Sequence, residues 1–387
     1  RPGRRELSAS GAVTPNLHER VAGLPLSATL AVNERSAALE AQGRDIVRLG
    51  LGQSPFPVPG VVVQALQRYA PEKDYLPVRG LTRLRDAVAA HHRARGVEVQ
   101  GEGVLVGPGS KELLFLVQLT FDGELLLPNP SWVSYEPQAR ILGRPVAWLD
   151  TAQDDGWRLQ PEALDAHCRV GGQRPRMLLL NYPNNPSGTT YSSAELEGLA
   201  RVARGHGVLI LSDEIYGEVH HEGAHDSIAR YYPEGTIVSS GLSKWCGAGG
   251  WRLGTFAFPR QLLWLQDAMA AVASETFTST SAPIQYAAAP TSSSSLLWRS
   301  LPSASSLSVE RETVTLAVGA FANEMDRRDE LMRNCGEHRL AGRVFVAQNP
   351  ISGVIRTVLK KTDPVPEEGE APESEPEDPE RYHTWPA

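Results

Sequence analysis

Apolar and polar positions along the first 290 residues alternate between two patterns, one typical of strands and one of helices. Several short runs are almost continuously apolar, which is typical of strands buried on both faces of a parallel sheet. They lie at 103–106, 125–127, 177–180, 208–211 and 236–238. Segments with apolar residues at helical spacing lie between them, at 82–92, 112–119 and from 192 onwards, where Ser192 and Glu195 have the spacing of a capping box. The pattern therefore predicts an α/β fold built on a mostly parallel sheet.

The two ends of the chain differ from this middle part. A helix is predicted over 28–41 and a short strand over 46–50, and after residue 290 the chain becomes serine-rich. Two further short strands are predicted at 344–346 and 353–358. Between residues 363 and 380 there are nine acidic residues and no basic ones, so this end is predicted to be a disordered tail.

Composition limits the classes of protein to which this chain can belong. Its 387 residues are enough for a large domain and a smaller one, and its net charge of -7 provides no basic field for nucleic acid. No apolar run approaches the length of a membrane span. We therefore expect neither a nucleic-acid partner nor a membrane partner.

The three cysteines indicate the compartment. Cys168, Cys246 and Cys335 lie far apart without metal-ligand spacing, so neither a disulfide framework nor a metal site is predicted. A reducing compartment is the default for such a chain, and we expect a cytoplasmic location. Targeting to an organelle stays open because the sequence begins at Arg1 and not at a methionine.

Candidate chemistry centres on Lys244, which follows the apolar run 236–238, and on Arg252 in the glycine-bearing loop after it. The lysine amine can form a Schiff base with a carbonyl cofactor, and the planar arginine fork suits a phosphate. Taken alone, a lysine is more often a solvated surface residue. The pairing of the two suggests pyridoxal phosphate (PLP).

A second glycine-bearing turn is suited to the phosphate. The run 103–106 leads into a turn with Gly109, Ser110 and Lys111, and a predicted helix follows. Such a turn presents free backbone N–H groups and the positive end of the helix dipole, both of which favour a dianion. Because many α/β proteins have glycine turns at this place, the turn alone supports a phosphate site without establishing one.

The electronics of PLP point to a carboxylate at a neighbouring strand end. The cofactor accepts electrons well only while its pyridine nitrogen stays protonated, which requires a fixed carboxylate opposite that nitrogen. Asp213, just after the run 208–211, is the candidate, because ligands bind at the carboxyl ends of strands in wound α/β sheets. A helix cap or a metal ligand is the alternative role for this aspartate. Tyr216 and Asn185 are candidates for hydrogen bonds that tune the cofactor.

Trp132 comes shortly after the run 125–127, where its indole can stack on a planar ring; a core tryptophan is the alternative.

With these residues in this order, the chain resembles the class I and II PLP-dependent aminotransferases, the aspartate aminotransferase-like enzymes of fold type I. The stretches Gly-Leu-Ser-Lys at 241–244 and Trp-Arg-Leu-Gly at 251–254 carry most of the resemblance.

The resemblance implies a fold and its division into domains. A large domain holds a mostly parallel seven-stranded sheet sandwiched by helices, and both chain ends contribute to a smaller α/β domain. The implied boundaries are 1–45 for an N-terminal arm and helix in the small domain, 46–290 for the large PLP-binding domain, 291–361 for an atypical C-terminal part of the small domain, and 362–387 for the disordered tail.

The resemblance also implies roles for individual residues. Lys244 is the catalytic residue and carries PLP as a Schiff base, while Tyr75 reaches the phosphate of a neighbouring subunit, which implies a homodimer with shared sites. The other cofactor-binding residues are Gly109, Ser110, Lys111, Trp132, Asn185, Asp213, Tyr216 and Arg252, and the substrate-binding residues are Gly52, Asn185 and Trp132.

The implied activity is PLP-dependent transfer of an amino group from an L-amino acid to a 2-oxo acid, within amino acid metabolism and biosynthesis. The chain departs from the family at Gly241, where members often have a serine, and its arginine for the substrate α-carboxylate has no clear match. Arg356 is a candidate stand-in. The alternatives are a PLP-dependent lyase (β-elimination or aminocyclopropane-carboxylate-synthase-like) and a PLP-binding protein with little turnover. The amino donor and the 2-oxo acid stay open.

Overall fold

The structure is a computed structural model that describes residues 16–48, 52–54, 56–170, 172, 174–219, 224–289, 344–348, 355–359 and 382–385. The α-helices are α1 (Ala28–Ala41), α2 (Gly60–Tyr69), α3 (Thr82–Arg93), α4 (Ser110–Thr120), α5 (Tyr135–Leu142), α6 (Pro161–Val170), α7 (Ser193–His206), α8 (Leu263–Thr276) and α9 (Ala282–Ala288). The strands are β1 (Ile46–Arg48), β2 (Val104–Gly107), β3 (Glu124–Asn129), β4 (Val146–Asp150), β5 (Arg176–Asn181), β6 (Leu209–Asp213), β7 (Thr236–Gly241), β8 (Gly254–Ala257), β9 (Val344–Gln348), β10 (Ile355–Leu359) and β11 (Tyr382–Trp385).

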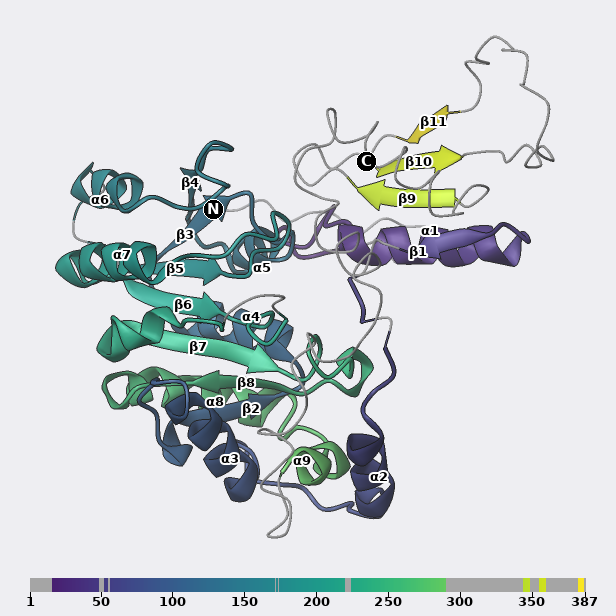
Figure 1. Cartoon of the computed structure of the whole chain (residues 1–387), viewed down its shortest axis with the longest axis horizontal. Helices are drawn as coiled ribbons and strands as arrows, with labels where there is room; N and C mark the ends of the chain where they lie inside the picture. Colours follow the sequence, from purple (N-terminus) through teal and green to yellow (C-terminus); the bar gives the residue numbers. More distant parts are fainter. Residues whose placement is uncertain are drawn as a thin grey trace, which may run out of the picture.

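A seven-stranded sheet forms the centre of the molecule (Figure 1). Its order is β2-β8-β7-β6-β5-β3-β4, and the neighbours from β7 to β4 all run parallel. Only β8 is reversed, because it pairs antiparallel with β2 on one side and with β7 on the other. The predicted fold, a mostly parallel seven-stranded sheet in an α/β protein, is confirmed.

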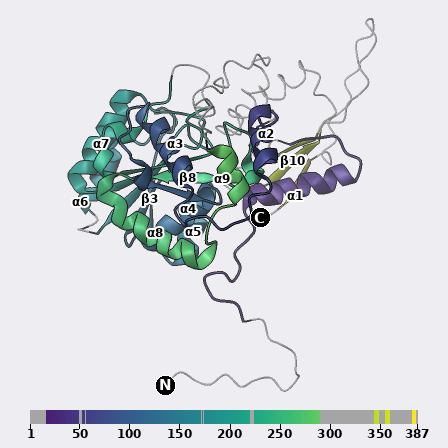
Figure 2. The ribbon, with the colours of Figure 1, turned by 90° about the horizontal axis from the view of Figure 1, so that it is seen from below.

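Helices cover both faces of this sheet. Alternate strand residues point to opposite faces, so Leu125 and Leu127 of β3 pack with α4, α5 and α8, whereas Leu126 packs with α6 and α7. A third apolar cluster joins α3 to β2 and β8. Figure 2 shows the helices on the two sides of the sheet. Burial on both faces explains why β5 reads as a continuous apolar run, since its residues are buried throughout.

A second, four-stranded sheet joins the two ends of the described chain. Its order is β1-β9-β10-β11, with β1 parallel to β9 and the other pairs antiparallel. The boundary at residue 46 stays a prediction, although β1, at the start of the predicted large domain, belongs to this second sheet. Within the segment 362–387, for which disorder stays a prediction, Tyr382–Trp385 form β11 against β10. These four residues follow the acidic run, and aromatic and β-branched residues favour strands.

Local signals in the sequence locate most of the predicted elements correctly. The helix over 28–41 is confirmed as α1, and the capping box of Ser192 and Glu195 opens α7 as expected. The serine-rich segment after residue 290 lies outside the described residues. No helix in the described part of the chain is both long and apolar enough to cross a membrane.

A buried histidine on α3 gives the folded chain a defined acid sensitivity. Burial lowers the pKa of His92 from its usual 6.5 to about 4, with the neighbouring His91 acting in the same direction. Between these two values the unfolded chain binds a proton on His92 that the folded chain does not. Folding stability should therefore fall as the pH drops through this window, by about 3 kcal/mol in total.

Replacing His92 with leucine should remove this contribution. We expect His92→Leu to lose less unfolding free energy than the unsubstituted chain between pH 7.5 and pH 4.5, by about 2–3 kcal/mol. Urea unfolding at the two pH values measures it. Equal losses in both proteins would show that His92 titrates normally in the folded state.

Candidate functional site

The predicted site residues gather at one edge of the seven-stranded sheet. Parallel strands end at the same edge, and the loops after β2, β3, β5, β6 and β7 carry these residues. Reversed strand β8 begins at this edge, since Gly254 pairs with Gly107 at the end of β2 and with Gly241 at the end of β7. Arg252, two residues before β8, is thereby brought to the same edge. This is the position at which wound α/β sheets bind ligands.

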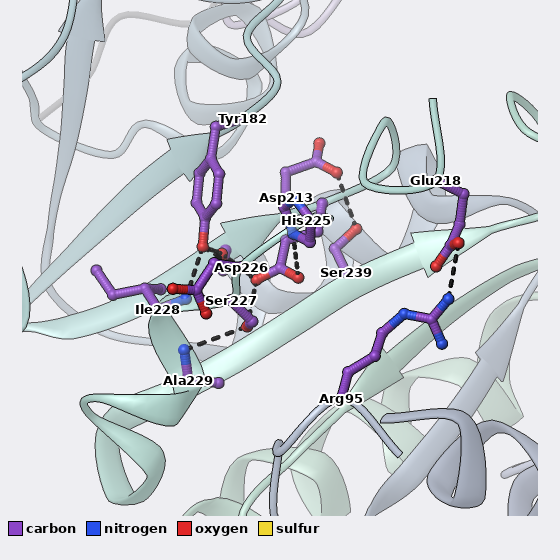
Figure 3. A network of polar contacts seen from close by, with 12 residues as sticks. Arg95, Tyr182, Asp213, Glu218, His225, Asp226, Ser227, Ile228, Ala229 and Ser239 are labelled. Atoms are coloured by element: carbon purple, nitrogen blue, oxygen red, sulfur yellow. Dashed lines mark hydrogen bonds and ion pairs between the residues drawn. The ribbon is translucent and has the colours of Figure 1, made fainter. Parts of the chain in front are cut away.

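Asp213 is a buried carboxylate at the end of β6. It is 3% exposed, and its Oδ2 accepts a hydrogen bond of 2.8 Å from the Tyr135 hydroxyl. Its Oδ1 accepts bonds from Ser239 Oγ at 3.2 Å (Figure 3) and from the backbone N–H of Ile215 at 3.3 Å. Burial raises the pKa of Asp213, although these three donors oppose the shift. A cation opposite the carboxylate would stabilise its ionised form.

Tyr135 links Asp213 to the aromatic wall of the site. Its ring meets that of Trp132 edge-on, with centroids 5.2 Å apart, and the Lys111 ammonium lies 5.2 Å from the centroid of Trp132. Tyr135 is fully buried, and burial together with the charge of Asp213 raises its pKa well above the usual value. Its hydroxyl therefore stays protonated and donates to the carboxylate.

Lys244 lies after the end of β7, next to Tyr216. Its ammonium is 5.2 Å from the centroid of the Tyr216 ring and donates a hydrogen bond of 3.2 Å to the carbonyl oxygen of Gly52. Gly52 has a φ of 57°, which favours glycine in this loop. The structure thus brings together three of the predicted residues, and Gly52 comes from a segment far away in the sequence.

Gly109, Lys111 and Arg252 form a positively charged corner. Gly109 has a φ of 95° and precedes α4, and a β-carbon at this residue would collide with the guanidinium of Arg252. The Arg252 side chain also donates to the carbonyl of Gly249 at 2.8 Å. Burial lowers the pKa of Lys111, and the nearby Arg252 lowers it further. Because two neighbouring cations repel each other, an anion bound between them would be stabilised.

Ser110 begins α4 at this edge, and of the remaining two predicted residues, Asn185 and Tyr75, only Asn185 belongs to the same edge. The backbone N–H of Asn185 donates to Asn181 Oδ1 at 2.7 Å, and Asn181 Nδ2 donates to the carbonyl of Asp213 at 2.8 Å. Tyr75, in contrast, is 88% exposed in the loop before α3. Within a single chain the structure does not bring it to the other site residues.

Two partners of Asp213 were missed from the sequence. Tyr135 and Ser239 carry no motif of their own, and each becomes a neighbour of Asp213 only through the fold. The sequence carries a weak signal for Ser239, which is the polar residue directly after the apolar run 236–238. The structure shows that it is paired with Asp213 in the register of β6 and β7. Cys246, next but one to Lys244, is a free buried thiol whose pKa burial raises to about 11, so it stays protonated near neutral pH.

Comparisons with known proteins identify the family of the chain. The family model described as aminotransferase class I and II matches residues 44–325. The aspartate/prephenate aminotransferase of Thermus thermophilus is 36% identical over 277 residues, 70% of each chain, and the aspartate aminotransferase of Geobacillus stearothermophilus is 34% identical over 282 residues, also 70% of each. The solved structure of aspartate aminotransferase from Thermus thermophilus with maleate matches with a TM-score of 0.68 and 31% identity, over 89% of this chain and 85% of that one. The chain therefore belongs to the class I and II aminotransferases, PLP-dependent enzymes that transfer nitrogenous groups.

Proposed function

We propose that Lys244 carries the cofactor of this aminotransferase, and that the amino donor is a dicarboxylic L-amino acid such as aspartate, with a 2-oxo acid as acceptor. The carrying observation is that Lys244 and Asp213 follow the ends of the neighbouring parallel strands β7 and β6, where Lys244 lies against Tyr216 and Asp213 is bonded to Tyr135. The proposed donor draws support from the relatives, since five of them are aspartate aminotransferases by name and the solved neighbour is described with maleate, a dicarboxylate.

The positive corner fits the phosphate of PLP. The first N–H groups of α4 have no preceding carbonyl to bond, and the helix dipole adds positive potential there. Lys111 and Arg252 contribute two positive charges, and Ser110 contributes a hydroxyl at the start of the helix. Gly109 keeps the space in front of the guanidinium open. These groups together form a donor set suited to a dianion.

The aromatic and acidic residues fit the ring. Asp213 provides the carboxylate for a protonated pyridine nitrogen, Trp132 provides an aromatic face, and Tyr216 and Asn185 provide donors for the ring oxygen. When bound, PLP supplies an electron sink for bond changes at the substrate α-carbon. Asp213 and Lys244 would therefore act at opposite ends of one conjugated ligand.

Lys244 is placed to move a proton during the reaction. Its Nζ would take the proton from the substrate α-carbon and return it at the other end of the transfer, as a general base and acid. Gly52 lies against Lys244 and would contact the substrate, as would Asn185 and Trp132. Arg356 lies on β10, opposite Ala347 of β9, and stays a candidate for the substrate α-carboxylate.

We also propose a cytoplasmic homodimer that acts in amino acid biosynthesis. The exposed phenol of Tyr75 supports the dimer, because an aromatic side chain so far out of its own fold is suited to a neighbouring subunit. In that arrangement Tyr75 would complete the phosphate site of the partner. The metabolic role follows from the names of the relatives and from the proposed donor.

Replacing Lys244 with alanine tests the proposal. We expect Lys244→Ala to lose the visible absorbance of bound PLP, and to lose about a thousandfold in the rate of amino transfer from aspartate to 2-oxoglutarate. Lys73→Ala is the matched control, because Lys73 is exposed and pairs with Asp74. Full turnover in Lys244→Ala would refute the assignment, and release of ammonia without amino transfer by the unsubstituted enzyme would favour the lyase.

Adding a methyl group at Gly109 tests the phosphate corner. Gly109→Ala should weaken PLP binding by about tenfold or more, since the β-carbon displaces Arg252, but should leave pyridoxal, which lacks the phosphate, unaffected. Absorbance titrations with both ligands measure this. Gly205→Ala on α7 has open space and should be neutral or more stable by about 0.5–1 kcal/mol. Equal weakening for both ligands would exclude Gly109 from the phosphate site.

A further inference from the structure

A second buried carboxylate lies directly beside Asp213 and points into a different network. Glu214 is 7% exposed, and its Oε1 accepts hydrogen bonds from Ser227 Oγ at 2.6 Å, Ser212 Oγ at 2.8 Å and the Tyr182 hydroxyl at 3.2 Å. Its Oε2 lies 2.8 Å from His225 Nε2. A single buried side chain therefore has four hydrogen-bonding partners.

The network ties three separate segments of the chain together. Tyr182 directly follows β5, Ser212 lies in β6, and His225 and Ser227 belong to the described segment that starts at residue 224. The Tyr182 hydroxyl also accepts a bond of 2.7 Å from the backbone N–H of Ile228, and its ring stacks on His225 at 5.3 Å (Figure 3). If any one of these segments moved, its hydrogen bonds to the other two would break.

Two of these segments, those of Tyr182 and Ser212, carry or adjoin residues of the proposed ring site, and His225 and Ser227 bond to Glu214 between them. Asp213 lies between Ser212 and Glu214 in the chain, and Tyr216 follows two residues later. Asn185 belongs to the loop that Tyr182 begins, and Asn181 bonds that loop to Asp213. The proposed partners of the ring nitrogen and of the ring oxygen are therefore held by the same network, that of Glu214.

The charges of Glu214 and His225 support an ionised pair. Burial alone would raise the pKa of Glu214, but the charge and hydrogen bond of His225, with the two serine donors, hold it below its usual value. Burial alone would lower the pKa of His225, and Glu214 raises it instead. Since removing one partner of a buried pair leaves an uncompensated charge, the pair is fixed in place.

We propose that Glu214 and His225 are positioning residues of the cofactor site, which fix the distance between Asp213 on one side of the PLP ring and Tyr216 and Asn185 on the other. They do not touch the ring themselves. The inference rests on the proposed function. If the network only stabilised the core, breaking it would lower the melting temperature without changing how PLP is held. This difference makes the proposal testable.

Circular dichroism in the visible band of bound PLP reports the positioning directly. PLP is achiral, so its band is optically active only when the site holds the ring in a fixed asymmetric setting. We expect Glu214→Ala to lower the ellipticity per bound PLP by about threefold and to weaken PLP binding by about tenfold. His225→Gln keeps a donor near the position of Nε2, so it should retain more of the signal than His225→Ala.

Glu218→Ala is the matched control. Glu218 lies four residues further on, pairs with His91 at 3.1 Å and with Arg95 at 2.8 Å, and is turned towards α3 (Figure 3). Its loss should lower the melting temperature while leaving the ellipticity per bound PLP unchanged. Should Glu214→Ala fail to fold, His225→Ala and His225→Gln carry the test.

Wild-type ellipticity and wild-type PLP affinity in the Glu214 or His225 variants, at any melting temperature, would overturn the proposal. A failure of the proposed function is distinguishable from this result. If the proposed function is wrong, the unsubstituted protein and its Lys244→Ala variant will show no difference in the PLP band. That result is seen without any substitution at Glu214.

Discussion

The site is built around a buried carboxylate, Asp213, which forms no ion pair with any residue that the structure describes, and burying such a charge is costly. Asp213 is held at the end of β6 by Tyr135 and Ser239, two hydroxyl donors that come from a different helix and a different strand. Neutral donors reduce the cost of burying the charge without removing it, which is why burial still raises the pKa of Asp213. A cation that entered the site would offset this cost, and in the function we propose the protonated ring of PLP is that cation.

The opposite end of the site has the complementary charge. Lys111, Arg252 and the start of α4 gather positive potential in one corner, while Asp213 provides the negative end beyond Trp132 and Tyr135. A ligand with a dianionic phosphate at one end and a cationic ring nitrogen at the other satisfies both ends at once. The direction of β8 sets this arrangement. Because β8 runs antiparallel to β2 and β7, it begins at the edge where the other strands end, and Arg252 just before it lies there too.

Sequence patterns predicted the parts of the site that follow strand ends, because a continuous apolar run marks a buried parallel strand and the polar residues after it must lie at the sheet edge. Lys244, Asp213 and Ser110 were found in this way. Tyr135, Ser239 and the pair of Glu214 and His225 were not, since their roles depend on which strands and helices become neighbours, and no local spacing encodes this. The strand at Tyr382–Trp385 was missed for a related reason, because the acidic run before it dominated the composition of the segment.

The most direct test of the account is the thermal stability of Asp213→Asn with and without PLP at pH 8. Asparagine keeps acceptor and donor atoms for Tyr135 and Ser239 but has no charge to bury. Because the folded-state pKa of Asp213 is raised, its ionisation costs folding stability once the pH is above that value, so the variant without PLP should melt higher than the unsubstituted protein. Saturating PLP should then raise the melting temperature of the unsubstituted protein more than that of the variant. A variant that melts lower without PLP and gains as much from PLP would contradict the claim that Asp213 is buried in order to hold a cationic ring.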